Sequence, residues 1–291
     1  MKPLHLILLL AMNCLWAVSF SAFKALKPSL DEGGVATLRF GLSGAILLLC
    51  WPWLPGLAPR RRDLVRTMIM GVIVFVCAPR LQVAGVQRSL ATDASILMAL
   101  APLIDSVGAA IFLGEYIAPL RWLGFLLGLT GAVLMGEVWR PDFRLPVLAA
   151  TALILLSFSC ESAYSVMGKP VLARAGLFKV LAVALMAGTI VNLFIDGKHT
   201  LRAAAVMPAT GWLVLGYLAV ICTLAGYSLW FVVIKEAQVN VAALTLFVQP
   251  VLGAAVAMVW LHETLRWGQL WGGLVIVLGL IVGLQRQARR L

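Results

Sequence analysis

Long apolar stretches alternate with short polar breaks along almost the whole chain. Ten stretches separate in this way, at about 4–23, 34–54, 67–87, 92–113, 120–139, 146–167, 177–195, 209–233, 240–260 and 267–285. A helix that crosses a lipid bilayer needs about 20 mainly apolar residues, and the stretches are close to this length. Prolines and glycines mark the breaks between them. The pattern predicts an all-α integral membrane protein with ten transmembrane helices, and residues 4–23 are expected to be the first helix rather than a signal peptide.

The chain also matches itself at a displacement of 148 residues. The matched pairs include Pro102 with Pro250, Glu115 with Glu263, Gly124 with Gly272 and Gly131 with Gly279. Polar and special residues that keep their spacing over such a distance indicate a duplicated unit. We therefore expect two five-helix repeats, residues 1–143 and 144–291. Because five is an odd number, the second repeat enters the membrane upside down, an arrangement common in secondary transporters with a site where the halves meet.

Composition agrees with a lipid environment and indicates an orientation. The chain is 62% hydrophobic and 12% charged, with a mean hydropathy of +1.01, whereas soluble domains carry about 25% charged residues. If the helices alternate, thirteen Lys and Arg residues lie on the side of the N-terminus and nine on the other. This bias predicts cytoplasmic termini in a cell inner membrane. The net charge of +11 is then explained by helix ends near lipid head groups, and we expect no nucleic-acid partner.

Other functional classes lack their motifs. His5, His199 and His262 are far apart, and the five cysteines lie singly in apolar stretches. The sequence contains no P-loop, no H-E-x-x-H and no G-x-S-x-G motif. We therefore expect no cofactor, no metal site and no enzyme activity. The alternatives are a membrane enzyme, a sensor or a channel, and saturable counterflow in vesicles would separate a transporter from all three.

Several motifs resemble those of the EamA-type members of the drug/metabolite transporter superfamily. The first stretch contains Leu15-Trp-Ala-Val-Ser-Phe-Ser-Ala-Phe-Lys24, and the second contains Thr37-Leu-Arg-Phe40. The fourth reads Ala91-Thr-Asp-Ala-Ser-Ile-Leu, then Pro102 and Leu113-Gly-Glu115. The second copy of the fourth motif reads Leu261-His-Glu263, with His262 in place of the glycine. In the first motif, Ala17 stands where the family usually has glycine. The resemblance implies ten helices, cytoplasmic termini and export of small polar metabolites, often amino acids or their derivatives.

Three charged residues within the stretches are candidates for cargo or proton chemistry. Asp105 and Glu161 are the acidic side chains deep in predicted spans, where a carboxylate can exchange a proton near neutral pH. Each is a proton-coupling candidate, and each can instead contact a cargo ammonium or a Ser or Asn partner. Arg39 either binds a cargo carboxylate through its planar fork, snorkels to the head groups, or pairs with Asp31 or Glu32. These charges suit a zwitterion, such as an amino acid or an amino-acid-derived metal chelator.

Aromatic and amide side chains complete the candidate binding site. Trp16, Tyr164, Tyr227 and Trp230 lie away from the predicted helix ends, so they either wall a cavity for an organic cargo or pack in the core. Gln249 is a buried amide that needs a partner. Its partner is either the cargo or a neighbouring helix.

Paired special residues suggest hinges and contacts between helices. Pro102 and Pro250 each remove a backbone hydrogen bond from a predicted helix, which makes them candidate hinges or cavity-lining positions. Glu115 and Glu263 are expected to cap or pair at helix ends, with a gate as the alternative, and Lys24 and Lys169 are expected to anchor at the interface. Glycines recur in the fifth and tenth stretches; this small-residue face either packs the two halves together or pairs two protomers as a homodimer.

Together these features predict a secondary active transporter that exports small polar metabolites by alternating access, with proton exchange as its candidate driving force.

Overall fold

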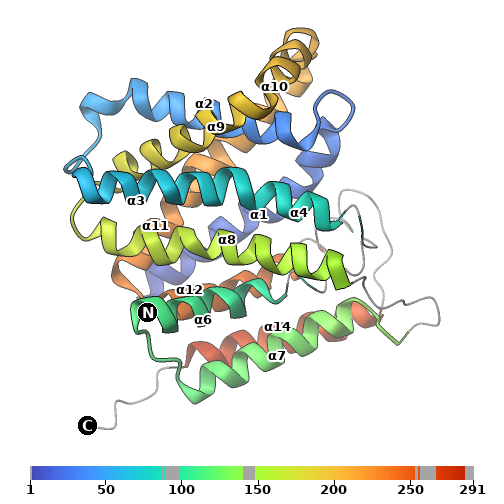
Figure 1. Ribbon diagram of the computed structural model, residues 1–291. Helices are drawn as coiled ribbons and strands as arrows, with labels where there is room; N and C mark the ends of the chain where they lie inside the picture. The colour runs from blue at the N-terminus through green and yellow to red at the C-terminus, as the bar shows by residue number, and fades with distance from the viewer. Residues whose placement is uncertain are drawn as a thin grey trace.

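The computed structural model describes residues 2–86, 88, 97, 99–139, 148–252, 255 and 267–285. Regular elements in these residues are all helical (Figure 1). The first half contains α1 (Pro3–Leu26), α2 (Glu32–Leu49), η1 (Trp51–Trp53), α3 (Arg61–Val72), η2 (Ile73–Cys77), α4 (Ala78–Val86), α6 (Ala101–Leu113) and α7 (Pro119–Met135). The second contains α8 (Leu148–Leu172), α9 (Leu177–Val206), α10 (Ala209–Gly216), η3 (Tyr217–Ala225), α11 (Gly226–Glu236), α12 (Val239–Leu244), η4 (Thr245–Phe247) and α14 (Trp267–Leu284).

Within the described ranges, six helices are long and apolar enough to cross a membrane: α2, α3–α4, α8, α9, α10–α11 and α14. Four shorter apolar helices accompany them, at Pro3–Ser19, Ala101–Leu113, Pro119–Met135 and Val239–Leu252. Many large apolar side chains remain exposed on the outside of the bundle, including Phe112, Phe194 and Leu213. Such a surface is suited to lipid, where apolar side chains need no shelter from water.

Local chemistry fixes several helix ends. The Asp31 carboxylate accepts a hydrogen bond from the Gly34 backbone N–H at 2.7 Å and caps α2. Gly114 ends α6 in the left-handed region, with φ of 66°, where a residue without a Cβ is favoured. Pro119 then begins α7, because a proline in the first turn loses no helical hydrogen bond.

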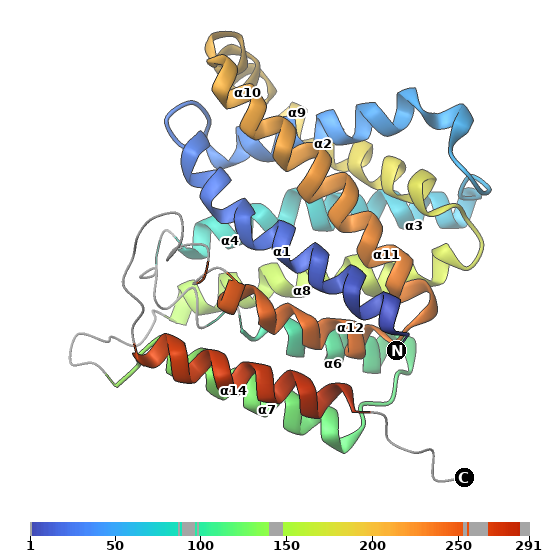
Figure 2. The ribbon, with the colours of Figure 1, turned by 180° about the vertical axis from the view of Figure 1, so that it is seen from behind.

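The glycine face predicted from the sequence joins α7 to α14 within one chain (Figures 1 and 2). A Cβ at Gly131 would lie 2.6 Å from the Gly272 carbonyl oxygen, and one at Gly124 would lie 2.8 Å from the Gly279 carbonyl oxygen. The two backbones therefore touch, as small residues allow in membrane helices. We call this contact the glycine seam; it packs the second half of the chain onto the first.

The remaining helix pairs also join the two halves. The α2 and α9 helices lie side by side at the edge opposite the glycine seam (Figures 1 and 2). Between these edges, α1 packs on α11, α4 on α8, and α6 on α12. The start of α1 and the end of α14 lie at the same end of the bundle (Figures 1 and 2), which we call the termini end.

Two long helices contain π-helical segments at related positions. The segment η2 interrupts α3–α4, and η3 interrupts α10–α11. At a displacement of 148, residues 73–77 fall on residues 221–225, the last five of η3. Side chains bond to carbonyls in both segments: Asn192 Nδ2 donates to the Phe75 oxygen at 2.9 Å, and Trp16 Nε1 donates to the Cys222 oxygen at 2.8 Å. Such partners satisfy backbone groups that lipid cannot.

Several predicted helix limits were wrong. The seventh stretch was expected to end near residue 195, but α9 continues to Val206, and the sixth continues as α8 to Leu172. The prediction that Pro102 interrupts a helix was also wrong for the described residues, because Pro102 lies in the first turn of α6 after a turn at residues 99 and 100. Pro250 follows the 3-10 turn η4, a break in the helical path at residues 245–247.

Candidate functional site

A cavity of about 460 Å³ lies among the helices, and all ten site residues named from the sequence line it. They come from elements of both halves: α1, α2, α6, α8, α11 and the helical residues that follow η4. The residues are Trp16, Arg39, Pro102, Asp105, Glu161, Tyr164, Tyr227, Trp230, Gln249 and Pro250. Residues separated by more than 200 positions in the chain therefore share one chamber.

The Arg39 guanidinium is held at the cavity wall. Only 9% of the residue is exposed. Its Nε donates to the Thr223 hydroxyl oxygen at 2.6 Å, and the Thr223 hydroxyl in turn donates to the Leu218 carbonyl oxygen. The guanidinium carbon lies 5.4 Å and 5.3 Å from the ring centroids of Phe23 and Phe40, within cation–π range. Asp31, which the sequence analysis named as a possible ion-pair partner of Arg39, instead caps α2.

Two carboxylates face the same cavity. Asp105 lies on α6 one turn after Pro102 and is half-buried, whereas Glu161 lies within α8 and is accessible from the cavity. Arg39 and both acids thus place one guanidinium and two carboxyl groups around one volume. Such a chamber can bind a small molecule that carries both an anionic and a cationic group.

Aromatic rings form much of the wall. The Tyr164 ring stacks on Phe231, with centroids 4.0 Å apart and an interplanar angle of 3°. Its centroid also lies 4.9 Å from that of Tyr227, which in turn lies 5.5 Å from Trp16. Linked rings of this kind are held rigidly by one another. They give an organic cargo a preformed apolar surface beside the charged groups.

The Gln249 amide is tied to a neighbouring helix. Its Nε2 donates to the Asn13 amide oxygen at 2.9 Å. Asn13 Nδ2 then donates to the Leu9 carbonyl oxygen at 2.8 Å and to the Thr245 hydroxyl at 3.2 Å. Gln249 therefore forms the hydrogen bond to a neighbouring helix that the sequence analysis gave as one of its two alternatives. It also lines the cavity.

Among the residues that the sequence analysis missed are Ser165, which lines the cavity, and Thr223, which positions a lining residue. Ser165 accepts a hydrogen bond from Trp230 Nε1 at 2.9 Å, and both line the cavity. Thr223 positions Arg39 through the bond described above. Small hydroxyl side chains are common in membrane helices, so neither residue carries a sequence signal that separates it from ordinary packing.

The helix-end residues behave partly as expected. Glu115 pairs at the end of α6, and its partner is Lys169 at 2.7 Å. The prediction that Lys169 anchors at the interface was therefore wrong. Glu263 and the side chain of Lys24 lie outside the part of the chain that the structure describes.

Solved structures share this fold. One crystal structure superposes with a TM-score of 0.78 over 97% of this chain and 96% of its own, at 17% sequence identity.

Curated relatives named as transporters or exporters match this chain, several of them over nearly its whole length. An uncharacterized transporter of Bacillus subtilis, YdfC, is 27% identical over 91% of this chain and 86% of its own length. A protein of Streptantibioticus cattleyicolor named "Probable terminal-alkyne amino-acid exporter" is 28% identical over 92% of this chain and 89% of its own. A riboflavin transporter of Rhizobium johnstonii is 30% identical over 40% of each chain.

The model of the EamA-like transporter family matches the chain twice, at residues 3–136 and 148–284. These two matches cover almost every residue, and the helices around the cavity fall within them. The chain is therefore a multi-pass membrane protein that belongs to the EamA-like transporter family.

Proposed function

We propose that this transporter exports small zwitterionic metabolites, such as amino acids or compounds derived from them, including amino-acid-derived metal chelators. The observation that carries the proposal is the single cavity that Arg39, Asp105 and Glu161 line together. The arginine suits a carboxylate of the cargo, and the acids suit its ammonium group. The name of the Streptantibioticus cattleyicolor relative, an amino-acid exporter, supports the same class of cargo.

We infer alternating access through two inverted five-helix repeats, residues 1–143 and 144–291. The double match of the family model supports this division. Contacts across the glycine seam support it as well, because Gly124 approaches Gly279 while their counterparts Gly272 and Gly131 approach each other. Reciprocal contacts of this kind are typical of a two-fold axis. With the termini in the cytoplasm of a cell inner membrane, cargo would cross from the termini end to the opposite end.

Proton exchange at Glu161, assisted by Asp105, is the proposed driving reaction. Glu161 is accessible from the cavity, so it can meet either water or cargo when the cavity opens to one side. A carboxylate that is protonated in one state and ionised in the other links proton flow to the change of state.

The test compares metabolites in the medium of cells that overproduce the wild type or Glu161→Gln. We expect a zwitterionic compound to be enriched outside cells with the wild type. Its enrichment should fall at least about tenfold with Glu161→Gln, because a bond to a charged group contributes about 1.5–3 kcal/mol. Glu236→Gln is the matched control, since Glu236 pairs with Lys2 on the surface with 53% of its side chain exposed.

The possible results separate the parts of the proposal. Equal enrichment by wild type and Glu161→Gln would keep export and remove Glu161 from the mechanism. No enriched compound, with all proteins shown to reach the membrane, would contradict export.

A further inference from the structure

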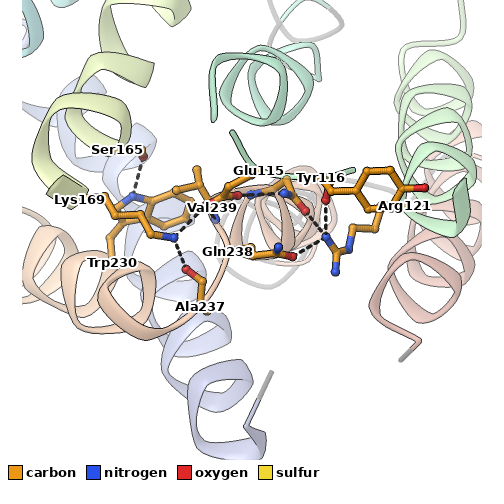
Figure 3. Close-up of polar contacts among 10 residues, drawn as sticks. Glu115, Tyr116, Arg121, Ser165, Lys169, Trp230, Ala237, Gln238 and Val239 are labelled. Atoms are coloured by element: carbon orange, nitrogen blue, oxygen red, sulfur yellow. Dashed lines mark hydrogen bonds and ion pairs between the residues drawn. The ribbon is translucent and has the colours of Figure 1, made fainter. Parts of the chain in front are cut away.

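A buried carboxylate with four hydrogen-bond donors (Figure 3) follows α6, at the termini end of the bundle (Figure 1). Glu115 accepts from Lys169 Nζ at 2.7 Å, from the Val239 backbone N–H at 2.9 Å, and from the Asn240 backbone and side-chain nitrogens at 3.1 Å and 2.8 Å. Only 7% of its side chain is exposed. We call Glu115, Lys169, Val239 and Asn240 the Glu115 cluster.

The cluster joins elements from both halves of the chain. Glu115 follows α6, Lys169 belongs to α8, and Val239 and Asn240 begin α12. Lys169 also donates to the Ala237 carbonyl oxygen after α11, at 2.6 Å. The carboxylate has all its partners only while the ends of α6, α8 and α12 are together, and the Lys169 ammonium group also holds the end of α11 there.

Arg121 on α7 adds a second layer to the cluster (Figure 3). Its Nη1 donates to the Asn240 side-chain oxygen at 2.6 Å, to the Gln238 side-chain oxygen at 2.7 Å and to the Tyr116 carbonyl oxygen at 3.1 Å. The Asn240 amide therefore uses its nitrogen for Glu115 and its oxygen for Arg121. This fixes the orientation of the amide and links the cluster to α7.

The cluster lies beyond the cavity along each element that contributes to it. On α8, Lys169 is one turn past the cavity residue Ser165, and on α6 Glu115 is ten residues past Asp105. On α11, the cavity residue Trp230 precedes Ala237 by seven residues. At 1.5 Å per helical residue, these separations are about 6 to 15 Å. The cluster therefore lies on the termini-end side of the cavity.

We propose that the Glu115 cluster is the closure of the cavity at the termini end, and that Glu115 sets how often the cavity opens to that side. This inference rests on the proposed alternating access. Opening separates α6, α8 and α12, and it leaves a carboxylate and an ammonium group without their partners. Unpartnered charges in a membrane helix bundle are strongly unfavourable until water reaches them. The intact cluster thus favours the state that is closed at this end.

The arrangement also connects the closure to the cavity. The Trp230–Ser165 hydrogen bond joins two cavity residues, and Ser165 lies one turn before Lys169 on α8 (Figure 3). A cargo that displaces Trp230 would disturb α8 one turn from the Lys169 ammonium.

The test measures which side of the membrane reaches the cavity. The five native cysteines are replaced, and Leu246→Cys, a cavity position on η4, reports labelling by a membrane-impermeant maleimide. Vesicles of both orientations are labelled for the wild type, Glu115→Gln and Glu236→Gln. With Glu115→Gln we expect labelling from the termini end to rise at least about tenfold and labelling from the opposite end to fall. A tenfold change needs only about 1.4 kcal/mol.

Glu236→Gln, the same substitution in the exposed pair with Lys2 at the same end, should leave both rates unchanged. Asn240→Ala removes one bond to Glu115 and should give a smaller shift in the same direction, which keeps the test open if Glu115→Gln does not accumulate. A rise from both ends together would indicate loosened packing and overturn the proposal, as would unchanged rates in both variants. The labelling needs no cargo, so this inference can fail while export is demonstrated, and it can hold while the cargo class proves different.

Discussion

Replacing Arg39 with lysine is expected to lower cargo affinity at least about tenfold, and replacing it with alanine should lower affinity further. Lysine keeps the charge but loses the planar fork that binds a carboxylate through two parallel bonds. It also loses the Nε–H that fixes Arg39 on Thr223. A hydrogen bond to a charged group contributes about 1.5–3 kcal/mol, which corresponds to roughly 10- to 150-fold in affinity. Binding or counterflow with the purified protein, using the metabolite found in the medium, measures the effect.

Arg80→Lys is the matched control for this substitution. Arg80 is also an arginine within a long helix, but it pairs with Asp196 and Asn192 on α9 and is not among the residues that line the cavity. Any general cost of changing an intramembrane arginine should appear in both variants, whereas the loss of affinity should follow Arg39 alone. If Arg39→Ala binds and transports like the wild type, the zwitterion hypothesis is abandoned.

Gly272→Ala should lower the midpoint of thermal unfolding by roughly 2–5 °C, whereas Gly273→Ala should leave it unchanged or slightly higher. A Cβ at Gly272 would meet the Gly131 carbonyl oxygen and lie 2.7 Å from the Met135 backbone nitrogen. Backbone atoms cannot move aside, so the seam must widen, and overpacking costs about 1–3 kcal/mol.

Gly273→Ala is the control that shows whether the close contact at Gly272 causes the loss of stability. A Cβ at Gly273 would lie 3.8 Å from the nearest Val251 carbon, an ordinary contact, and alanine is the better helix former by up to about 1 kcal/mol. Unfolding in detergent, followed by helix signal against temperature, compares the two variants. Equal midpoints would contradict the close contact between α7 and α14.

The hydrophobic pattern was sufficient to locate the candidate cavity, because charged and aromatic residues deep in apolar stretches have few alternatives to facing one another. Arg39, Asp105 and Glu161 were each identified on this ground, and the structure places all three around one volume. The pattern could not show that Thr223 holds Arg39, since that contact depends on how α2 packs against η3.

Helix ends were harder to interpret for a related reason. A lysine after an apolar stretch can extend to the lipid surface or pair with an acid, and the choice depends on which helix end lies beside it. Lys169 pairs with Glu115 because α6 and α8 end at the same place. Hydropathy also cannot show that α9 continues past residue 195 into a polar segment, where Asp196 pairs with Arg80.

The π-helical segments left no sequence signal either. Their composition is that of any apolar helix, and their extra residue per turn is stabilised by side chains from other helices, such as Asn192 and Trp16. Such a segment is fixed by tertiary contacts rather than by local propensity.

The glycine seam is matched between the two halves of the chain at the displacement of 148, but the cavity lining is not. If the chain consists of two repeats, as proposed above, a pair of identical five-helix units would carry the same glycines on both sides of the seam and two copies of every cavity group. In this chain the seam glycines stay matched, but at the displacement of 148 Arg39 falls on Ala187 and Asp105 falls on Gly253. Under the proposed repeats, the scaffold is matched and the cavity lining is not, which would offer a cargo with two unlike ends one favoured orientation instead of two.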